Sequence, residues 1–435
     1  MPTKVRLAKL LTDIPGKIRN GTAVVSVLGL GRVGLPLAIV LARSGVKVIG
    51  VDIDKQRLSS VEKGEMPFHY PALQDWLSAV VHDRMLTVSG SAKEAIQRSD
   101  IVILTVGTPT GSQYQLDYSQ LQSAIHEVLA ADLRNKAIIL RSTAVPGTMD
   151  TIVRPMFVKE TGLQIGKDFA LAVCPERILE GNAHKELYEL PEIIGAADVV
   201  SADIASELFR KINPKKRVVS TTPTGAELAK LFTNIYRYVN FAIANEFAIW
   251  SERYGEDAHE IVKVANDGYE RSKIPAPGFA GGPCLGKDGF LLDNNTTFSS
   301  IISTAWKLNE GVPQHVVQSL MRELGPLYKV RVAVLGLAFK ADSDDTRLSP
   351  SVKLVDILRA YGAEVLIHDP HVKGTETLEK ALTNPDAVIL ATNHSAFRNI
   401  AGRIDESGCK IFYDVWGVYK PTDFKKTRYM RFGKA

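Results

Sequence analysis

The stretch "TAVVSVLGLGRVGLPLAIVLARSG", Thr22 to Gly45, decides the fold. An apolar, β-rich run (23–28) enters a glycine turn, and a helical pattern follows from Val33 to Ala42. Gly45 then stands where a helix C-cap glycine belongs. The stretch predicts a strand, a tight turn and a helix, which together begin a parallel sheet covered by helices.

The glycine spacing in this turn is G-x-G-x-x-G. Gly29 permits the tight turn, Gly31 lets the backbone approach a diphosphate, and Gly34 lets the helix pack on the strand. Asp52 ends the next strand about 20 residues on, where a ribose-binding acid belongs. The pattern predicts a dinucleotide site, with a mere tight turn as the alternative. The acid favours NAD over NADP, although Arg57 lies near enough to leave NADP open.

Further apolar strands alternate with helical segments, which is typical of a parallel sheet covered on both faces. These strands are expected at 46–54, 100–110, 136–148 and 169–178. Thr108 and Thr143 follow two of them. Because ligands bind at the carboxyl ends of parallel strands, both are expected to touch cofactor or substrate. Ordinary turn chemistry is the alternative.

The middle of the chain is different. A helix without internal Gly or Pro is expected over 225–255, and it joins domains or forms a subunit interface. Helical sequence continues at 257–265 and 299–324, and then the strand pattern returns. The later strand segments are 330–351, 363–371, 386–394 and 410–417. We therefore predict an α/β protein with two Rossmann-like domains, 1–212 and 325–435, joined by a helical domain, 213–324.

Composition excludes several classes. The net charge is only +5 over 435 residues, and no basic block exceeds "NPKKR" (Asn213–Arg217), so we expect no nucleic-acid partner. No apolar run approaches a membrane span, and the basic N-terminal arm is not a signal peptide. The three cysteines fit neither a disulfide framework nor a metal site. We expect a cytoplasmic protein with reduced thiols.

Two polar patterns stand out on otherwise apolar elements. In "CPERILEG", Glu176 and Glu180 are four residues apart and are expected to share a helix face near a site, or else to be a solvated helix start. On the long helix, Lys230 and Asn234 are neighbours on one face, and Asn245 falls close to the same stripe. A buried lysine must pair or serve chemistry, for example by stabilising an oxyanion. An exposed helix edge is the alternative.

The stretch "PGFAGGPCLGKDGF" holds Cys284. Gly281 and Gly282 permit close backbone approach, and the cysteine is expected at a helix N-terminus with Lys287 nearby, which favours a thiolate. A thiolate beside a nicotinamide site captures an aldehyde as a thiohemiacetal, and a second hydride transfer gives a thioester. Asp288, one turn later, is expected to hold a lysine or a water. A buried cysteine in a glycine loop is the alternative.

Taken together these segments resemble the UDP-glucose/GDP-mannose dehydrogenase family, over about residues 22–420. The carrying motifs are "GLGRVGLPLA", "GTPT", "STAVPGT", "PERILEGNA", "AELAKLFTNIYRYVNFAIANE", "GGPCLGKD" and "GLAFKADSDDTRLSPS". The resemblance implies that C6 of a nucleotide sugar is oxidised twice, from alcohol to carboxylate, with two NAD. It also implies an N-terminal NAD domain, a central helical dimer region and a C-terminal nucleotide-sugar domain.

Roles follow from the resemblance, position by position. Cys284 matches the nucleophile, Lys230 and Asn234 the groups that stabilise oxyanions, and Asp288 the support for lysine or water. Other catalytic positions are Glu176, for base chemistry or water positioning, and Glu180 and Thr143, for the bound water and cofactor.

The binding residues follow in the same way. Lys340 and Arg347 match nucleotide contacts, and Arg271 resembles an arginine that reaches the neighbouring subunit's substrate site. From the residues alone, Lys340 and Arg347 offer cations for a diphosphate, or are surface charges on a loop. The second glycine turn lacks G-x-G-x-x-G, so no second NAD is expected there. The expected cofactor set is Gly29, Gly31, Val33, Gly34, Asp52, Arg57, Thr108 and Thr143. The expected substrate set is Glu176, Arg177, Lys230, Asn234, Arg271, Gly281, Lys340 and Arg347.

Signals for the sugar disagree. "PERILEGNA" resembles the UDP-N-acetylhexosamine branch, whereas the Lys-Asp ending of "GGPCLGKD" resembles the UDP-glucose and GDP-mannose branches. UDP-N-acetylglucosamine or UDP-N-acetylmannosamine is preferred, with UDP-glucose or GDP-mannose as the alternative. Two other classes stay open: a single-step NAD dehydrogenase or epimerase in which Cys284 is dispensable, and a non-enzymatic NAD-sensing protein.

Overall fold

The computed structural model describes residues 11–108, 117–293 and 301–434, and the chain divides into two compact units, 1–232 and 233–435. Parts of three sequence predictions lie outside the described residues: the first ten residues of the N-terminal arm, the loop 109–116 and the start of the helix predicted at 299–324. The boundary between the units falls inside one long helix, α10 (Pro223–Arg253), which the sequence predicted at 225–255.

The first unit is built on an eight-stranded sheet with the order β3-β2-β1-β4-β5-β6-β7-β8. Its strands are β1 (Val24–Leu28), β2 (Lys47–Val51), β3 (Leu86–Ser89), β4 (Ile101–Leu104), β5 (Ala137–Leu140), β6 (Ala170–Val173), β7 (Glu192–Ala196) and β8 (Val218–Thr221). All pairs are parallel except β6 with β7. The parallel pairing predicted for the strands named from the sequence is confirmed. β7, which the sequence analysis did not name, runs antiparallel to β6 because the connection through α8 leaves and re-enters the sheet at the same end.

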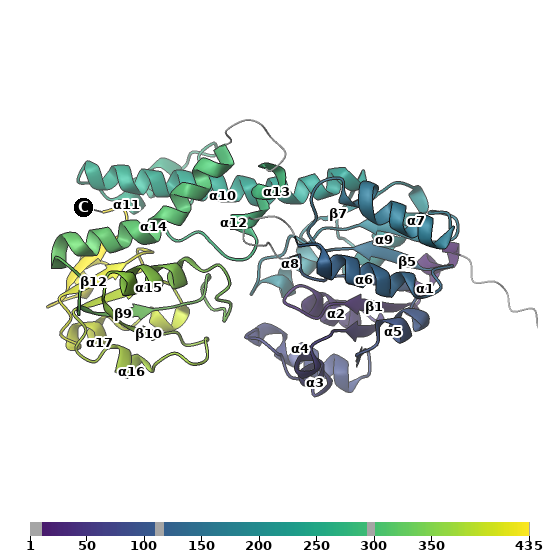
Figure 1. Ribbon diagram of the computed structural model, residues 1–435, viewed down its shortest axis with the longest axis horizontal. Helices are drawn as coiled ribbons and strands as arrows, with labels where there is room; N and C mark the ends of the chain where they lie inside the picture. Colours follow the sequence, from purple (N-terminus) through teal and green to yellow (C-terminus); the bar gives the residue numbers. More distant parts are fainter. Residues whose placement is uncertain (1–10, 109–116, 294–300, 435) are drawn as a thin grey trace, which may run out of the picture. The chain divides into compact units, whose positions relative to one another are not determined.

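Helices cover both faces of this sheet (Figure 1). Before β1 come η1 (Leu11–Asp13) and α1 (Ile14–Arg19), and then α2 (Gly34–Arg43), α3 (Lys55–Glu62), α4 (Pro71–His82), α5 (Ala92–Arg98), α6 (Ser119–Leu129), η2 (Met149–Val153), α7 (Arg154–Thr161), α8 (Ala183–Glu189) and α9 (Val199–Ile212). α2, α4 and α9 share one apolar core with the sheet, and α5, α6 and α7 share the other.

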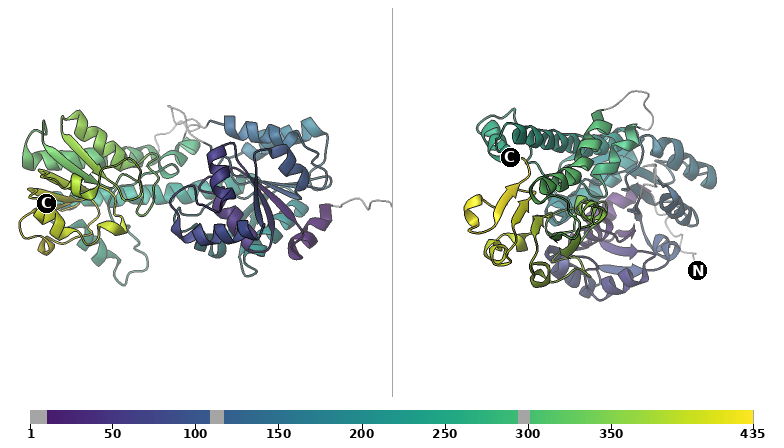
Figure 2. Two further views of the ribbon diagram at one scale, coloured as in Figure 1. Left: turned by 90° about the horizontal axis from the view of Figure 1, so that it is seen from below. Right: turned by 60° about the vertical axis from the view of Figure 1, so that its left-hand side comes forward.

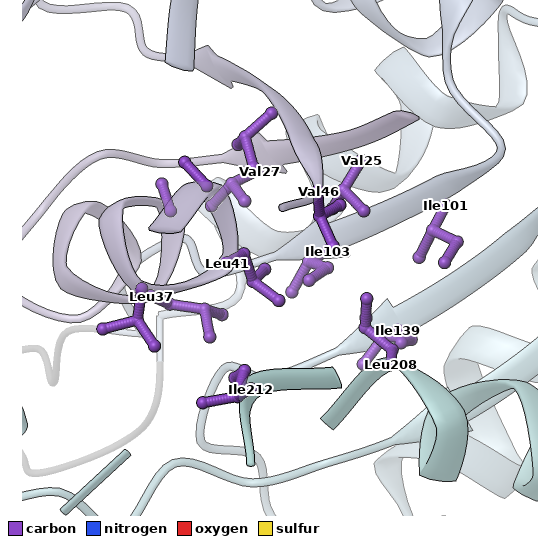
Figure 3. Close-up of a cluster of buried hydrophobic side chains, with 14 of the residues drawn as sticks. Val25, Val27, Leu37, Leu41, Val46, Ile101, Ile103, Ile139, Leu208 and Ile212 are labelled. Carbon is purple, nitrogen blue, oxygen red and sulfur yellow. The ribbon is translucent and has the colours of Figure 1, made fainter. Parts of the chain in front are cut away.

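The core around α2 shows why the first stretch folds as predicted. Side chains of β1 alternate, so Val25 and Val27 face α2, where Leu37 and Leu41 meet them, all fully buried (Figure 3). Gly45 ends the helix with φ +85°, a conformation that favours glycine. The strand and helix predicted from 22–45 are thus confirmed, and the glycine turn between them lies at the carboxyl end of β1.

The second unit contains a five-stranded parallel sheet with the order β10-β9-β11-β12-β13. Its strands are β9 (Arg331–Leu335), β10 (Glu364–His368), β11 (Ala387–Leu390), β12 (Ile411–Asp414) and β13 (Arg428–Arg431). Its helices are α11 (Ala258–Asn266), α12 (Leu285–Asp288), α13 (Phe290–Asp293), α14 (Ile301–Leu324), α15 (Pro350–Ala360), α16 (Leu378–Ala381), η3 (Ser395–Phe397), α17 (Ala401–Glu406) and η4 (Pro421–Asp423).

This second sheet is again covered on both faces, by α14 and α15 on one side and by α16 and α17 on the other (Figure 2). The prediction of two Rossmann-like sheets with helical sequence between them is confirmed. Among the described residues, no helix has the length and apolar character needed to cross a membrane.

Candidate active site

The glycine turn of the first unit has the shape that a dinucleotide requires. Gly29 has φ +99°, and a Cβ on Gly34 would lie 1.9 Å from the Gly29 carbonyl oxygen, so neither position accepts a side chain. A Cβ on Gly31 would meet nothing within 4 Å, so this glycine leaves open space instead. α2 begins directly after the turn, with Val33 as its N-cap. The N–H groups of Leu35 and Leu37 bond to the carbonyl oxygens of Gly31 and Val33, so it is the positive end of the helix dipole that favours an anion here. The turn therefore fits the diphosphate of NAD.

The sequence reading missed the residue that holds this turn from the neighbouring strand. Thr105, directly after β4, donates its hydroxyl to the carbonyl oxygens of Gly29 at 2.7 Å and Leu28 at 3.0 Å. The only sequence signal was a threonine at the end of an apolar strand, which also describes Thr108. Thr105 thereby ties the glycine turn to the end of the neighbouring strand.

Asp52 lies just after β2, as predicted, and faces the turn. Its Oδ2 accepts the Leu30 N–H at 2.7 Å, and its Oδ1 accepts the Asp54 N–H at 2.9 Å. The Arg57 guanidinium also donates to Oδ2, at 2.8 Å. The acid expected to bind ribose therefore lies at the turn. Arg57, the residue for which NADP was kept as an alternative, is hydrogen-bonded to this acid.

Thr108 and Thr143 lie where the sequence placed them, after the adjacent strands β4 and β5. Thr108 is buried and Thr143 is partly buried. Both are at the carboxyl edge of the sheet that also carries the glycine turn. The rest of the "GTPT" loop, from residue 109, lies outside the described residues.

The segment after β6 departs from the sequence reading. Residues 174–179 form no helix, so the expected shared helix face of Glu176 and Glu180 is wrong. Pro175 occupies the position where such a helix would start, and the carboxylate of Glu176 accepts the N–H groups of Arg177 and Ile178 at 2.7 and 2.8 Å. These bonds fold the backbone into a turn around the carboxylate, in competition with a helix.

The side chains of this segment also bond within the protein. Glu176 pairs with buried Arg141, Nε to Oε2 at 2.6 Å, and Glu180 pairs with Arg32 of the glycine turn. Arg177 donates to the carbonyl oxygen of Pro191. The sequence reading gave Arg141 and Arg32 no role, because their glutamate partners lie far away in the chain.

Lys230, on α10, is buried with 4% exposure, so the alternative of an exposed helix edge is wrong. One turn before it, Glu227 accepts the N–H groups of Gly147 at 2.6 Å and Met149 at 2.9 Å. Glu227 thereby anchors the turn that follows Thr143. Burial raises the pKa of Glu227 to about 7 in spite of these two bonds. Glu227 is a second residue that the sequence reading missed.

In the second unit, Cys284 is exposed and forms no disulfide. It is the N-cap of the short helix α12, as predicted, and its carbonyl accepts the Asp288 N–H at 3.0 Å. The alternative of a buried cysteine in a glycine loop is therefore wrong. Asp288 is fully buried, and its Oδ2 accepts Asn234 Nδ2 at 2.6 Å. An accessible thiol thus stands one turn from a buried carboxylate–amide pair.

The two glycines before the cysteine bring it against a second loop of the same unit. A Cβ on Gly281 would lie 2.5 Å from Pro350, and one on Gly282 would lie 2.5 Å from the ring of Phe339. Gly282 also donates its N–H to the Leu348 carbonyl at 3.0 Å. The close approach predicted for these glycines is confirmed, and it is made to the loop 337–349 and to Pro350 at the start of α15.

The loop 337–349 carries both cations expected at the nucleotide. Lys340 is partly buried. The Arg347 guanidinium makes bonds of 2.6 to 3.0 Å with the carboxylate of Asp345, while its side chain stays 61% exposed. The exposed part of this side chain offers positive charge to an anion. Arg271 is exposed and lies over the Tyr269 ring, 4.9 Å from its centre.

Comparison with known proteins agrees with the fold. Three models of the UDP-glucose/GDP-mannose dehydrogenase family match the chain: the NAD binding domain at 23–213, the central domain at 224–310 and the UDP binding domain at 333–421. A UDP-N-acetyl-D-mannosamine dehydrogenase of Pyrococcus horikoshii is 37% identical over 86% of this chain and 90% of its own length.

Two solved structures are also similar. A UDP-D-ManNAc dehydrogenase of Pyrococcus horikoshii is 35% identical with a TM-score of 0.88, over 94% of this chain and 99% of its own. The UDP-N-acetyl-mannosamine dehydrogenase of Staphylococcus aureus is 31% identical with a TM-score of 0.85, over 94% of this chain and 98% of its own.

Proposed function

Because the chain belongs to the UDP-glucose/GDP-mannose dehydrogenase family, we propose that it oxidises C6 of a UDP-N-acetylhexosamine, foremost UDP-N-acetylmannosamine, to the carboxylate in two NAD-dependent steps. The similar proteins named above support the choice of sugar. The observation that carries the two-step reaction is the exposed Cys284 thiol at the start of α12, beside the buried Asp288–Asn234 pair. A one-step dehydrogenase or an epimerase has no use for such a thiol.

The chemistry follows from these groups. NAD, when bound, takes one hydride from C6 in each of the two oxidations. The first oxidation leaves an aldehyde, and the Cys284 thiolate attacks its carbon to give a thiohemiacetal. Loss of the second hydride gives a thioester, which one water molecule cleaves to the acid and the thiol. The balance is one alcohol, two NAD⁺ and one water giving one carboxylate, two NADH and three protons.

The remaining residues take roles in this proposal according to their chemistry. Lys230 supplies a buried cation for the negative charge that develops on the C6 oxygen, and Asn234 supplies an amide donor for the same purpose. Asp288 holds Asn234 in place. Thr143 lies at the carboxyl edge of the first sheet and is assigned to the cofactor side.

Binding residues divide between the units in the proposal. NAD is assigned to the first unit, to the residues Gly29, Gly31, Val33, Gly34, Asp52, Arg57, Thr108 and Thr143. The uridine diphosphate is assigned to the second unit, where Lys340 and Arg347 offer cations for its phosphates. Since Cys284 must remain a thiol, a reducing compartment such as the cytoplasm suits the enzyme. The product, a uronic acid, suits polysaccharide synthesis.

The proposal includes a homodimer formed through α10. Tyr236, Ile243 and Trp250 follow one another at seven-residue intervals, two helical turns, and are 70%, 38% and 48% exposed. An apolar stripe at this spacing fits the same stripe of a second copy. Arg271, with its exposed guanidinium, is then assigned to the partner's substrate. In sedimentation velocity, Trp250→Glu together with Tyr236→Glu is expected to give monomers. A dimer that survives both changes would remove α10 from the interface.

The function is tested by measuring how many NADH molecules are formed per sugar molecule oxidised. Purified protein is incubated with NAD and, separately, UDP-N-acetylmannosamine, UDP-N-acetylglucosamine, UDP-glucose and GDP-mannose, and the NADH formed per sugar is measured with the product mass. Two NADH per sugar and a gain of 14 mass units, about the difference between CH₂OH and COOH, are expected with UDP-N-acetylmannosamine. One NADH per sugar would remove the thioester route. No NADH with any sugar would favour a non-enzymatic NAD-sensing protein.

A further inference from the structure

Asn245 lies on α10, close to the stripe that holds Lys230 and Asn234, and it takes no part in the chemistry proposed above. It is fully buried. Asn234 and Asn245 are eleven residues apart, or about three helical turns, so they lie on the same face of α10. A buried amide needs partners for its donor and its acceptor, and these partners indicate what the residue does.

The partners of Asn245 fix the direction of its amide. Its Oδ1 accepts the Gly278 N–H at 2.8 Å, and its Nδ2 donates at 2.9 Å to Oδ1 of Asn309, a buried residue of α14. Asn309 in turn donates its Nδ2 to the Tyr238 carbonyl of α10 at 3.1 Å. Because the first partner is an N–H and the last is a carbonyl, both amides have one possible orientation. The three bonds join α10, α14 and the residue six positions before Cys284.

Trp416, just after β12, contacts the same segment. A Cβ on Gly278 would lie 2.9 Å from the Trp416 ring, and Phe279 meets this ring edge-on, with 6.5 Å between the ring centres. The indole is fixed in turn, since its Nε1 donates to the Ala391 carbonyl at 2.9 Å. Gly278 is therefore bonded to α10 and packed against a side chain at the carboxyl end of the second sheet.

The segment after the thiol is bonded to α10 as well. Asn234 donates its Nδ2 to Asp288 Oδ2 at 2.6 Å, four residues past Cys284. Two asparagines on one face of α10 therefore hold the chain on both sides of the thiol, at Gly278 and at Asp288. All of these residues belong to one compact unit.

We propose that Asn245 is a positioning residue for Cys284. With Asn309 as its support, it fixes Gly278 and so sets the distance from the thiol to the carbon that the thiol attacks. A displacement of about 1 Å from the attacking geometry costs about 100-fold in rate. This inference rests on the proposed function for the attack on C6, whereas the bond between the segment and α10 is testable without it. If the two asparagines only stabilised the core, their loss would lower the Tm and leave kcat unchanged.

Asn245→Leu keeps the shape of the side chain and removes both polar atoms. We expect kcat for acid formation to fall about 100-fold, while the KM for each substrate stays at the parent value because the glycine turn and the loop 337–349 are left as they are. Ser251→Ala is the matched control: it removes one buried bond of the same helix, from the hydroxyl to the Phe247 carbonyl at 2.9 Å, and is expected to keep the parent kcat. The parent kcat in a folded Asn245→Leu protein would overturn the inference.

A second substitution separates positioning from stability. Asn245→Leu leaves Asn309 without its donor, whereas Asn245→Leu with Asn309→Leu replaces both partners by apolar side chains, which costs far less than replacing one. The Tm of the double variant is therefore expected to recover toward the parent value. Its kcat is expected to stay low, because the Gly278 N–H still lacks its acceptor. If kcat recovered together with the Tm, the two asparagines would be a structural pair and the inference would be overturned.

Hydrogen exchange of residues 277–288, followed by mass spectrometry, tests the bond to α10 without any substrate. Exchange is expected to become about tenfold faster in Asn245→Leu and to stay unchanged in Ser251→Ala. Unchanged exchange in Asn245→Leu would overturn the attachment. If the parent enzyme itself forms one NADH per sugar or none, the proposed function fails, and the exchange rates still decide the attachment.

Iodoacetamide labelling shows whether each variant is folded, because Cys174 and Cys409 are buried and Cys284 is exposed. If Asn245→Leu were labelled at all three cysteines, it would be unfolded, and Asn309→Leu alone would take its place. That variant keeps the Asn245 amide and removes its support, so a loss of about tenfold in kcat is expected. The parent kcat in Asn309→Leu would then overturn the inference.

Discussion

The two sheets of this protein start from the same design and reach different ligand sites. Each opens with a strand and a glycine in left-handed conformation, Gly29 at φ +99° and Gly336 at φ +94°, and each has an acid after the neighbouring strand. Asp52 accepts the N–H of Leu30. In the same way, Asp369 accepts the N–H of Leu337 at 2.7 Å. The backbone logic of strand, turn and acid is therefore shared.

The distance from the glycine to the next helix separates them. α2 begins five residues after Gly29, whereas α15 begins at Pro350, fourteen residues after Gly336. In the first unit the N-terminus of the helix faces the diphosphate site directly. In the second, a loop stands in between and carries the cations Lys340 and Arg347. One turn therefore offers the positive end of a helix to a diphosphate, and the other offers side-chain charge.

The acids also differ in what surrounds them. Asp52, buried just after β2, accepts a hydrogen bond from Arg57. Asp369 is capped by buried His394, whose Nε2 lies 3.0 Å from its carboxylate, while Nδ1 accepts the Asp342 N–H at 2.8 Å. Asp369 is therefore bonded to a histidine where Asp52 is bonded to an arginine.

Asp342, His371 and His394 place three possible metal-binding atoms within 4.8 Å of one another, the one such group among the described residues. Both ring nitrogens of His394 already bond to the protein. The geometry therefore favours a brace for the loop 337–349 over a cation site.

The largest expected effect comes from a substitution that removes the thiol of the second unit and leaves NAD binding by the first unit unchanged. Cys284→Ser is expected to lower acid formation more than about 10³-fold, because a serine hydroxyl is a far weaker nucleophile than a thiolate. NAD affinity, measured by calorimetry, is expected to stay at the parent value. Acid formation at the parent rate would mean that the thiol is dispensable and that the thioester route is wrong.

A smaller effect is expected from a substitution in the glycine turn of the first unit, which should change NAD affinity alone. Gly31→Ala adds a methyl group into open space, so the Tm is expected to stay unchanged, but the methyl group stands where the diphosphate approaches. We expect NAD affinity to fall about 100-fold and UDP affinity to stay constant. Calorimetric titration with each nucleotide checks both. Equal loss of both affinities would contradict the division of the two ligands between the two sheets.

A substitution in the second unit tests the same division of ligands by weakening the binding of the UDP-sugar alone. Lys340→Met is expected to raise the KM for the UDP-sugar about tenfold, the effect of one lost charge contact to a phosphate. The KM for NAD is expected to stay the same. Lys373→Met removes an exposed lysine of the same sheet's surface and serves as the control. If Lys340→Met changed the KM for NAD, the assignment of this lysine to the UDP-sugar would be wrong.

The smallest expected effect is on the pH dependence of stability, and it differs between a buried acid of the first unit, Glu227, and one of the second, Asp369. Burial raises the pKa of Glu227 to about 7, so the fold binds its proton more tightly than the unfolded chain does. Its contribution to stability is full below pH 4.5 and is lost as the pH rises to about 7. We expect Glu227→Gln to remove this slope, with a change of a few degrees in the Tm difference between pH 5 and 8. A constant Tm difference would contradict the raised pKa.

Asp369 is expected to change the pH dependence of stability in the opposite direction, because its pKa is lowered and not raised. Burial opposes its ionisation, but the bond from His394 and the backbone N–H groups outweigh burial and lower its pKa. Its contribution is present above the usual aspartate range and is lost as the pH falls below it. The same thermal scans extended to acid pH test this. Asp369→Asn is expected to flatten the acid limb and to leave the slope near neutral pH intact.

Most of the fold was predictable because its signals are local. Apolar runs set the strands, the glycine spacing set the first turn, and a Gly- and Pro-free run set α10. The site residues proposed from one motif, such as Gly31, Asp52 and Cys284, rest on local signals of the same kind. The helix expected for Glu176 and Glu180 failed because the turn around Glu176 is made by bonds that periodicity does not register.

The sequence by itself determined which groups the chain carries: a glycine turn after the first strand, an acid after the next strand, a thiol at a helix start and a loop with two cations. Only the tertiary structure decided which charges meet. Arg141 reaches Glu176 across 35 residues, and Arg32 reaches Glu180 across 148. The physical reason is that burying a charge requires a partner in space, and a folded sheet supplies that partner from strands that no local pattern connects.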